Sequence, residues 1–129
     1  MIRKLVLLAI VALTSATLAA AAPEATKKAP TTLTGELVDT GCYLGHGARG
    51  EKHIDCATKC IAGGMPMGLL TSAGKLYLIT LNHDNPDPYN KLKEMVGKTV
   101  SVTGVVSVRS GMQGIDVTDA KLAAAEPAK

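Results

Sequence analysis

The stretch GKTVSVTGVVSV, residues 97–108, decides the fold of this chain together with GIDV at residues 114–117. Four of its valines fall on one face of an extended chain, with small polar residues mostly opposite: Val100, Val102, Val106 and Val108. Gly104 interrupts the alternation, which is typical of a bulge or a tight bend in a curved sheet. A turn-rich segment separates the two stretches, so we predict consecutive strands over residues 98–108 and 115–122.

The residues before this stretch predict three more strands and a helix. LTGELVD, residues 33–39, suits a first strand, and GLLTSAGKLYLITL, residues 68–81, is typical of a β-hairpin. A short amphipathic helix is then expected, with Asp87 as its N-cap and Pro88 at the first helical position. Gly97 is suited to the position just past the end of this helix.

The predicted order is strand, long insert, strand, strand, helix, strand, strand, which makes the chain mainly β. A helix between the third and fourth of five strands is the layout of the OB-fold, a small Greek-key barrel. The two stretches quoted first also resemble the fourth and fifth strands of small secreted bacterial OB-fold proteins. We therefore expect one OB-like domain over residues 33–122, with an insert at 40–67 and a disordered tail at 123–129. A small β-sandwich is the alternative.

The N-terminal residues have the layout of a secretory signal peptide. Arg3 and Lys4 are followed by an apolar run and then by small residues that suit a signal peptidase. The apolar run is shorter than the roughly 20 residues that a membrane-spanning helix needs. We therefore predict a signal peptide at residues 1–22, a flexible leader at 23–32 and a periplasmic or secreted protein without stable membrane insertion after cleavage.

The charge and composition argue against nucleic acid as a partner. Loss of Arg3 and Lys4 with the signal peptide would reduce the formal net charge of +3 to about +1. The chain has no Phe and no Trp and only three tyrosines, whereas single-stranded nucleic acid is bound by stacking aromatics and basic tracks. No motif is specific for catalysis either. The composition therefore favours a non-enzymatic binding protein whose interior is filled by Val, Leu, Ile and Met.

The insert at residues 40–67 contains all three cysteines of the chain: Cys42, Cys56 and Cys60. In OB-folds the loop after the first strand belongs to the usual binding surface, so the resemblance implies that these cysteines lie where such proteins bind their ligands. The first half of the insert, GCYLGHGARG at 41–50, contains four glycines, and we expect it to be irregular.

The second half of the insert, EKHIDCATKCIAGG at residues 51–64, predicts two to three helical turns that end at a pair of glycines. At 100° per residue, His53, Cys56 and Cys60 lie along one edge of the buried face of this helix. The glycine-rich segment above would bring Cys42 to the same edge. The insert therefore gathers sulfur and nitrogen donors.

Three thiolates and an imidazole form a soft donor set, which suits Cu(I) or Zn(II) better than Mg²⁺ or Ca²⁺. The predicted metal ligands are Cys42, Cys56, Cys60 and His53, and copper is the preferred ion. Weaker candidates lie in the same insert: His46, Met65 and Met67. The two methionines also suit the role of core filler at the start of the second strand.

A disulfide is the alternative use of these cysteines, because exported proteins form disulfides. Cys42 would pair with Cys56 or Cys60, and the closed loop would stabilise the fold by ~3 kcal/mol in the chain-entropy model. The chain would then be a stapled protein-interaction module without metal, with a periplasmic protein as its partner. The third cysteine would be left over, and thiol-redox chemistry is a further hypothesis for it.

Overall fold

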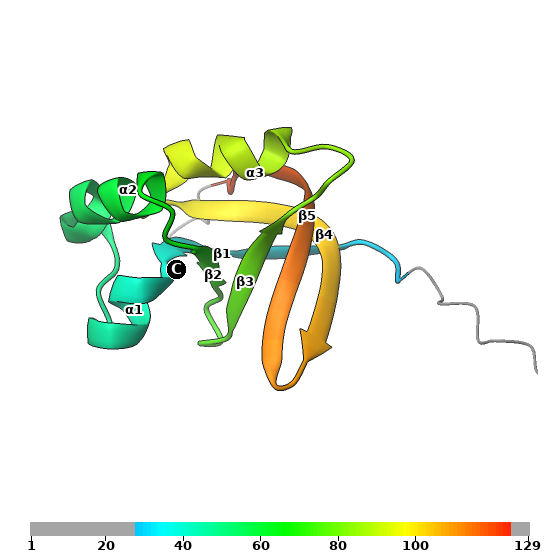
Figure 1. Ribbon diagram of the computed structural model, residues 1–129, viewed down its shortest axis with the longest axis horizontal. Coiled ribbons are helices and arrows are strands. Elements are labelled where there is room, and N and C mark those ends of the chain that lie inside the picture. The colour runs from blue at the N-terminus through cyan, green and yellow to red at the C-terminus, as the bar shows by residue number, and fades with distance from the viewer. Residues whose placement is uncertain (1–27, 125–129) are drawn as a thin grey trace, which may run out of the picture.

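The structure, a computed structural model, describes residues 28–124 and is mainly β, with five strands and three α-helices (Figure 1). The strands are β1 (Thr31–Asp39), β2 (Met67–Leu70), β3 (Leu76–Leu81), β4 (Thr99–Arg109) and β5 (Met112–Leu122). The helices are α1 (Thr40–His46), α2 (Ile54–Ala62) and α3 (Asp87–Leu92), with 3-10 turns at Glu51–His53 and Lys93–Met95. The predicted signal peptide, residues 23–27 of the predicted leader and residues 125–129 of the predicted tail lie outside the described residues.

The predicted order of elements is confirmed, with a helical insert between β1 and β2 and a helix between β3 and β4. The first strand begins earlier than predicted, at Thr31 rather than Leu33. Thr31 and Thr32 pair with Gly104 and Thr103 of β4, and the two threonine hydroxyls of Thr32 and Thr103 lie 2.8 Å apart. The predicted leader therefore extends too far into the domain.

The five strands form a mixed sheet that closes on itself in the order β1-β2-β3-β5-β4, with β4 pairing back to β1. All of these pairs are antiparallel except β3 with β5, which is parallel. A parallel pair needs a long crossover connection, which here consists of α3 and β4. In Figure 1, α3 crosses one end of the sheet, and α1 and α2 lie together at one side.

Gly104 lies at the irregularity that the sequence predicts in the fourth strand. The pairing of β4 with β5 shifts between Thr103 and Gly104, which confirms the predicted bulge or bend. A Cβ atom at Gly104 would collide with the carbonyl oxygen of Asp116 and would lie 2.9 Å from Cγ1 of Ile115. The close approach of two backbones in the curved sheet therefore requires glycine here.

We predict that Gly104→Ala lowers the free energy of unfolding by about 1–3 kcal/mol, because the added methyl group would push two paired strands apart. Chemical denaturation monitored by circular dichroism measures this change. Gly45→Ala is the matched control, since an added Cβ at this helical glycine meets no atom within 4 Å. The control is expected to be neutral or stabilising by up to about 1 kcal/mol. Equal destabilisation of both variants would contradict the prediction.

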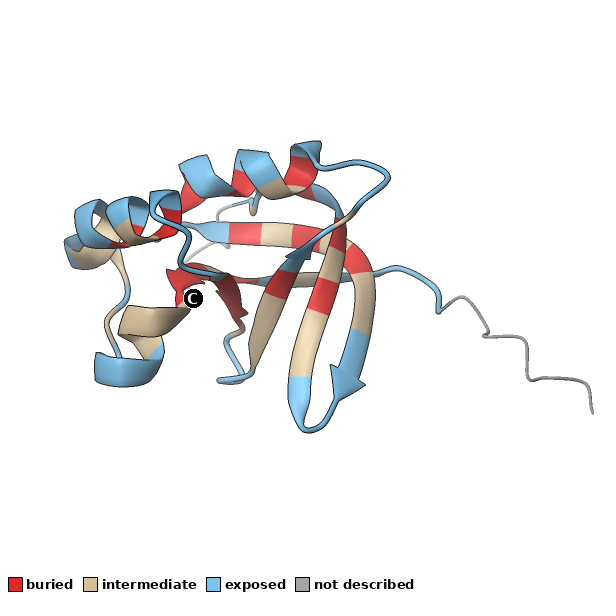
Figure 2. Ribbon diagram, viewed as in Figure 1, coloured by how far each residue is buried: buried red, intermediate tan, exposed pale blue. Residues whose placement is uncertain are grey.

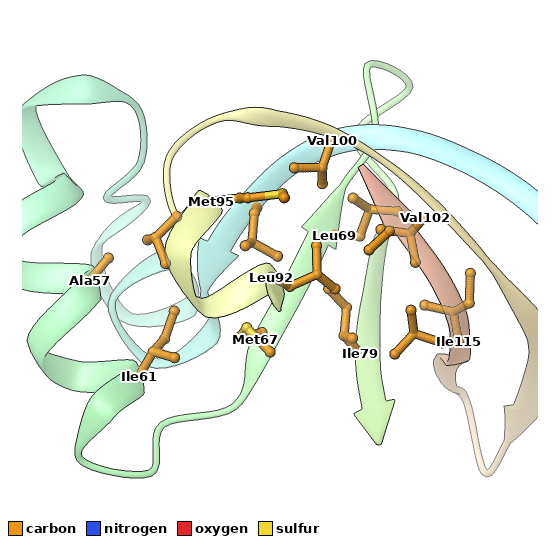
Figure 3. Packing of buried hydrophobic residues seen from close by; sticks show 14 residues of the cluster. Ala57, Ile61, Met67, Leu69, Ile79, Leu92, Met95, Val100, Val102 and Ile115 are labelled. Carbon is orange, nitrogen blue, oxygen red and sulfur yellow. The ribbon is translucent and has the colours of Figure 1, made fainter. Parts of the chain in front are cut away.

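The hydrophobic core contains no Phe or Trp and is built from aliphatic side chains and methionine, as the composition predicts (Figure 3). It combines residues from the sheet, from α2, from α3 and from the 3-10 turn after α3: Leu37, Ala57, Ile61, Met67, Leu69, Ile79, Leu92, Met95, Val96, Val100, Val102, Ile115, Val117 and Ala120. Figure 2 shows that the outward surfaces of α2 and α3 remain exposed. The insert is thus attached to the domain through the same core as the sheet.

The third helix begins one position earlier than predicted, with Asp87 inside the helix and Pro86 as its N-cap. Leu92 is fully buried and Tyr89 packs against the core, so the predicted amphipathic face is confirmed. Gly97 follows the helix with a φ of 73°. None of the helices between residues 28 and 124 has the length and apolar character needed to cross a membrane.

Candidate metal centre

The glycine-rich segment 41–50 is largely helical, so the prediction of an irregular segment there was wrong. Asp39 precedes α1, and its Oδ1 atom accepts hydrogen bonds from the backbone N–H groups of Gly41 at 2.8 Å and Cys42 at 3.3 Å. Gly47 ends the helix with a φ of 67°, in the left-handed region that favours glycine. These two caps offset the low helix propensity of glycine and place Cys42 in the first turn of α1.

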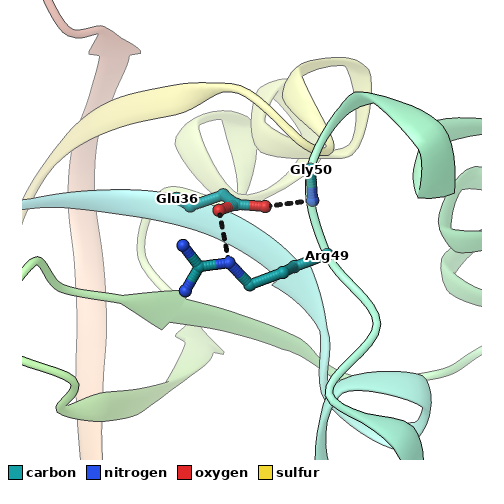
Figure 4. A network of polar contacts seen from close by, with 3 residues as sticks. All are labelled: Glu36, Arg49 and Gly50. Carbon is teal, nitrogen blue, oxygen red and sulfur yellow. Dashed lines mark hydrogen bonds and ion pairs between the residues drawn. The ribbon is translucent and has the colours of Figure 1, made fainter.

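The segment between α1 and α2 is held against β1 by Glu36 (Figure 4). One carboxylate oxygen of Glu36 accepts a hydrogen bond from the backbone N–H of Gly50 at 2.5 Å. The other oxygen lies 3.4 Å from Nε of Arg49. Since Arg49 is more than half exposed, the ion pair is expected to contribute little to stability by itself. Its effect is to fix the path of the chain from α1 to α2.

The predicted helix in the second half of the insert is confirmed. A 3-10 turn ending at His53 leads into α2, whose buried residues are Ala57 and Ile61. Cys60 is half-buried beside this apolar face, whereas Cys56 is exposed. The cysteines therefore flank the face that packs on the core rather than lying within it.

Cys42 lies at the centre of the candidate site. Its sulfur, a nitrogen of His53 and the sulfur of Cys56 lie within 4.8 Å of one another. The same Cys42 sulfur, an oxygen of Asp39 and the sulfur of Cys60 also lie within 4.8 Å of one another. The structure thus brings together the three cysteines and the histidine that the sequence selects, in two triads that share Cys42.

Asp39 is the residue of the site that sequence reasoning missed. It is the only charged or polar side chain in the buried core of the described residues, with 1% of its surface exposed. An aspartate directly before a helix is a common N-cap, but this signal is visible only once the segment after it is expected to be helical. Because that segment is expected to be irregular, the sequence predicts no partner for Asp39 beyond its place at the end of a strand.

Two polar atoms at the site are buried without a hydrogen-bond partner in the described residues: Oδ2 of Asp39 and Nε2 of His53. Buried polar atoms are rarely left unpaired, because the lost interaction with water costs free energy. Both atoms belong to residue types that bind metal ions, and both residues lie beside Cys42. The donors present therefore fit a bound cation.

The acid–base properties of the site are dominated by contact between thiols and the Asp39 carboxylate. Hydrogen bonding to Asp39, desolvation and the negative charge of Asp39 raise the pKa of Cys42 to about 12. Burial raises the pKa of Cys60, and the neighbouring Cys56 and Asp39 act in the same direction. Burial alone would raise the pKa of Asp39, but hydrogen bonds from Cys42, Gly41 and Cys60 outweigh it, so that this pKa is lowered. Without a metal the site therefore holds protonated Cys42 and Cys60 beside an ionised carboxylate.

The three weaker candidates lie in different surroundings. His46 is exposed at the end of α1 and belongs to neither triad. Met67 is fully buried in the core, so it serves as core filler and is not available as a ligand. Met65 lies beside Gly41, since a Cβ added to Gly41 would be 2.7 Å from its Sδ atom. Of the three, Met65 is therefore the one shown next to a sequence neighbour of Cys42.

A groove of about 770 Å³ on the described residues does not contain the cysteines. It is lined by hydroxyl groups, by Glu36 and Arg49, and by some apolar residues. Its lining contains no cysteine, methionine or histidine, so it lacks the donors that a soft metal ion prefers.

We predict that Asp39→Ala lowers the free energy of unfolding by about 0.5–2 kcal/mol through loss of the N-cap, and that Asp39→Asn retains most of the cap. Because the pKa of Asp39 is lowered on folding from 3.8, its stabilising effect is present above that value and is lost as pH falls through the folded pKa. Denaturant titrations of the metal-free chain between about pH 2 and pH 6 should therefore show a weaker acid dependence for Asp39→Asn. An unchanged acid dependence would contradict this role for Asp39.

Comparison with known proteins adds no relative: no protein-family model, no curated protein and no solved structure matches this chain.

Proposed function

We propose that this chain is an exported, non-enzymatic protein that binds a soft metal ion through the triad Cys42, His53 and Cys56. The observation that carries the proposal is the position of the Cys42 sulfur, within 4.8 Å of both the Cys56 sulfur and a His53 nitrogen. These residues come from two separate helical segments, and the capped start of α1 and the anchored segment after it hold them in place.

Cu(I) is the preferred ion and Zn(II) the second choice. Two thiolates and one imidazole form a soft donor set, and thiolate and thioether ligands favour Cu(I). The thioether of Met65 lies beside Gly41, the sequence neighbour of Cys42, and is a further sulfur of this kind. Zn(II) also accepts two sulfurs and one nitrogen, and would complete four-coordination with one more ligand.

We also propose that the domain is related to the OB-fold. The closed strand order and the helix between β3 and β4 support this relationship. In that fold the loop after the first strand contributes to ligand binding, and this is where the insert with its cysteines lies. Export rests on the N-terminal sequence and is tested by N-terminal sequencing of the protein recovered outside the cytoplasm.

Metal content and thiol count, measured together on protein purified without chelator and without oxygen, test the proposal. We expect at least one equivalent of copper or zinc per chain, and three titratable thiols after denaturation in the presence of a chelator. His53→Gln should lower metal affinity, whereas His83→Gln, which changes a histidine outside both triads, is the matched control and should not. No metal, one disulfide and one thiol would contradict the proposal and favour the stapled interaction module.

The disulfide alternative draws on the same geometry, since Cys42 lies close to both Cys56 and Cys60. Thiol-redox chemistry has less support, because reactive cysteines have lowered pKa values and those of Cys42 and Cys60 are raised. Alkylation of the native, metal-free chain at neutral pH distinguishes this case. We expect Cys42 and Cys60 to be labelled slowly, and rapid labelling of either would favour a redox protein.

A further inference from the structure

The donors around Cys42 do not form a single set. The first triad, Cys42 with His53 and Cys56, contains two sulfurs and a nitrogen, and the second, Cys42 with Asp39 and Cys60, contains two sulfurs and an oxygen. No group of four or five of these donors meets the same 4.8 Å limit within residues 28–124. Cys42 is the only member that the two triads share.

One metal ion cannot reach all five residues without rearrangement. With metal–sulfur bonds of about 2.3 Å and metal–nitrogen bonds of about 2.0 Å, a tetrahedral ion holds its ligand atoms about 3.3–3.8 Å apart. An ion in the first triad would therefore leave Asp39 and Cys60 outside its coordination sphere. Asp39 is not free to swing toward that ion, because it is buried and its Oδ1 atom is fixed by two backbone N–H groups.

An ion bound in the first triad leaves one oxygen of the Asp39 carboxylate without a partner. Its Oδ2 atom is buried and has no hydrogen-bond partner in the described part of the chain. A buried carboxylate oxygen without a partner costs free energy, because it has lost its interaction with water. A second cation between Asp39, Cys42 and Cys60 removes this cost.

We infer that Cys42 is a bridging ligand between two metal ions, one in each triad. The second ion is of the borderline type represented by Zn(II), because its donors include a carboxylate oxygen as well as two thiolates. This inference rests on the proposed function, since it assigns a second ion next to the first. Asp39 then has two roles: one oxygen caps α1 and the other is a metal ligand.

Cadmium, which is observable by NMR and binds thiolates, is the probe for this arrangement. The reduced full chain is loaded with ¹¹³Cd(II), and its stoichiometry is measured by native mass spectrometry. We expect two ions per chain. In a cadmium–proton correlation spectrum, the β protons of Cys42 should couple to both ¹¹³Cd resonances, those of Cys56 to one, and those of Cys60 to the other.

Two variants separate the second ion from the first. Cys60→Ser should reduce the stoichiometry from two to one and leave the Cys56 correlation intact. Asp39→Asn retains a side chain that can cap α1. It should lower the affinity for the second ion about 10–100-fold, while the first ion still binds. Far-ultraviolet circular dichroism verifies that each variant is folded. Should Asp39→Asn fail to fold, Cys60→Ser still gives the answer.

A wild-type chain that binds one ion, with Cys42 coupled to one resonance, would overturn the bridge and leave the proposed function intact. Two ions without a shared Cys42 would also overturn it. A reduced chain that binds no ion would overturn both the bridge and the proposed function.

Discussion

Cys42→Ser is expected to lower the affinity of the reduced chain for Cu(I) or Zn(II) by more than about 100-fold. Loss of a residue next to a metal ligand already costs about 10–100-fold, and Cys42 is itself a predicted ligand that belongs to both triads. The hydroxyl group of serine is a poor ligand for a soft ion. Competition against a chromophoric chelator of known affinity measures the change.

Cys60→Ser is the matched control for this prediction, since it removes the same thiol but leaves the triad of Cys42, His53 and Cys56 intact. It should weaken binding less than Cys42→Ser. Because Cys42 is only partly buried, the serine variant should stay folded, and circular dichroism verifies this. Affinity unchanged in Cys42→Ser, with binding lost in another variant, would place the metal elsewhere.

Metal affinity should increase steeply with pH. Each thiol must lose its proton to bind, and the pKa of Cys42 in the metal-free chain is about 12, compared with an ordinary value of 9.0. Cys42 is therefore protonated in the metal-free chain below about pH 8, and its ionisation on binding contributes about a tenfold increase in affinity per pH unit. Cys42 alone would give about a 100-fold change between about pH 6 and pH 8. Competition titrations at several pH values test this slope.

Stability of the metal-free chain should change with pH in the opposite direction. A thiol whose pKa is raised on folding stabilises the folded state below its unfolded pKa, and this contribution is lost as pH rises from 9.0 toward about 12. Cys42→Ser should remove this loss of stability at alkaline pH. It should also reduce by one the number of protons released when metal binds. Metal affinity independent of pH would contradict thiolate ligation.

The sheet and the second half of the insert could be predicted because both depend on local pattern. The alternation of apolar and polar residues over 98–108 predicts a strand. The spacing of His53, Cys56 and Cys60 predicts that they lie along one edge of a helix. Gly104 was recognisable because a glycine within an alternating strand commonly marks a bulge or a close approach of two backbones. Each of these signals lies within a few residues along the chain.

The remaining features depend on signals that are meaningful only in combination, or on contacts between distant residues. The helix α1 forms despite its glycines because Asp39 caps it and Gly47 ends it, and the two caps are only meaningful together. The parallel pairing of β3 with β5 follows from closure of the whole sheet, and no single segment encodes it. Asp39 joins the site for the same reason, since its partners Cys42 and Cys60 come from different helices.

X-ray absorption at the metal edge of the loaded chain most directly tests whether these cysteines and the histidine coordinate a metal. A first coordination shell dominated by sulfur at about 2.3 Å, with a smaller contribution from nitrogen, is the predicted result for bound Zn(II). A shell of oxygen and nitrogen alone would mean that the thiols of α1 and α2 are not ligands, and the account of this site would be wrong.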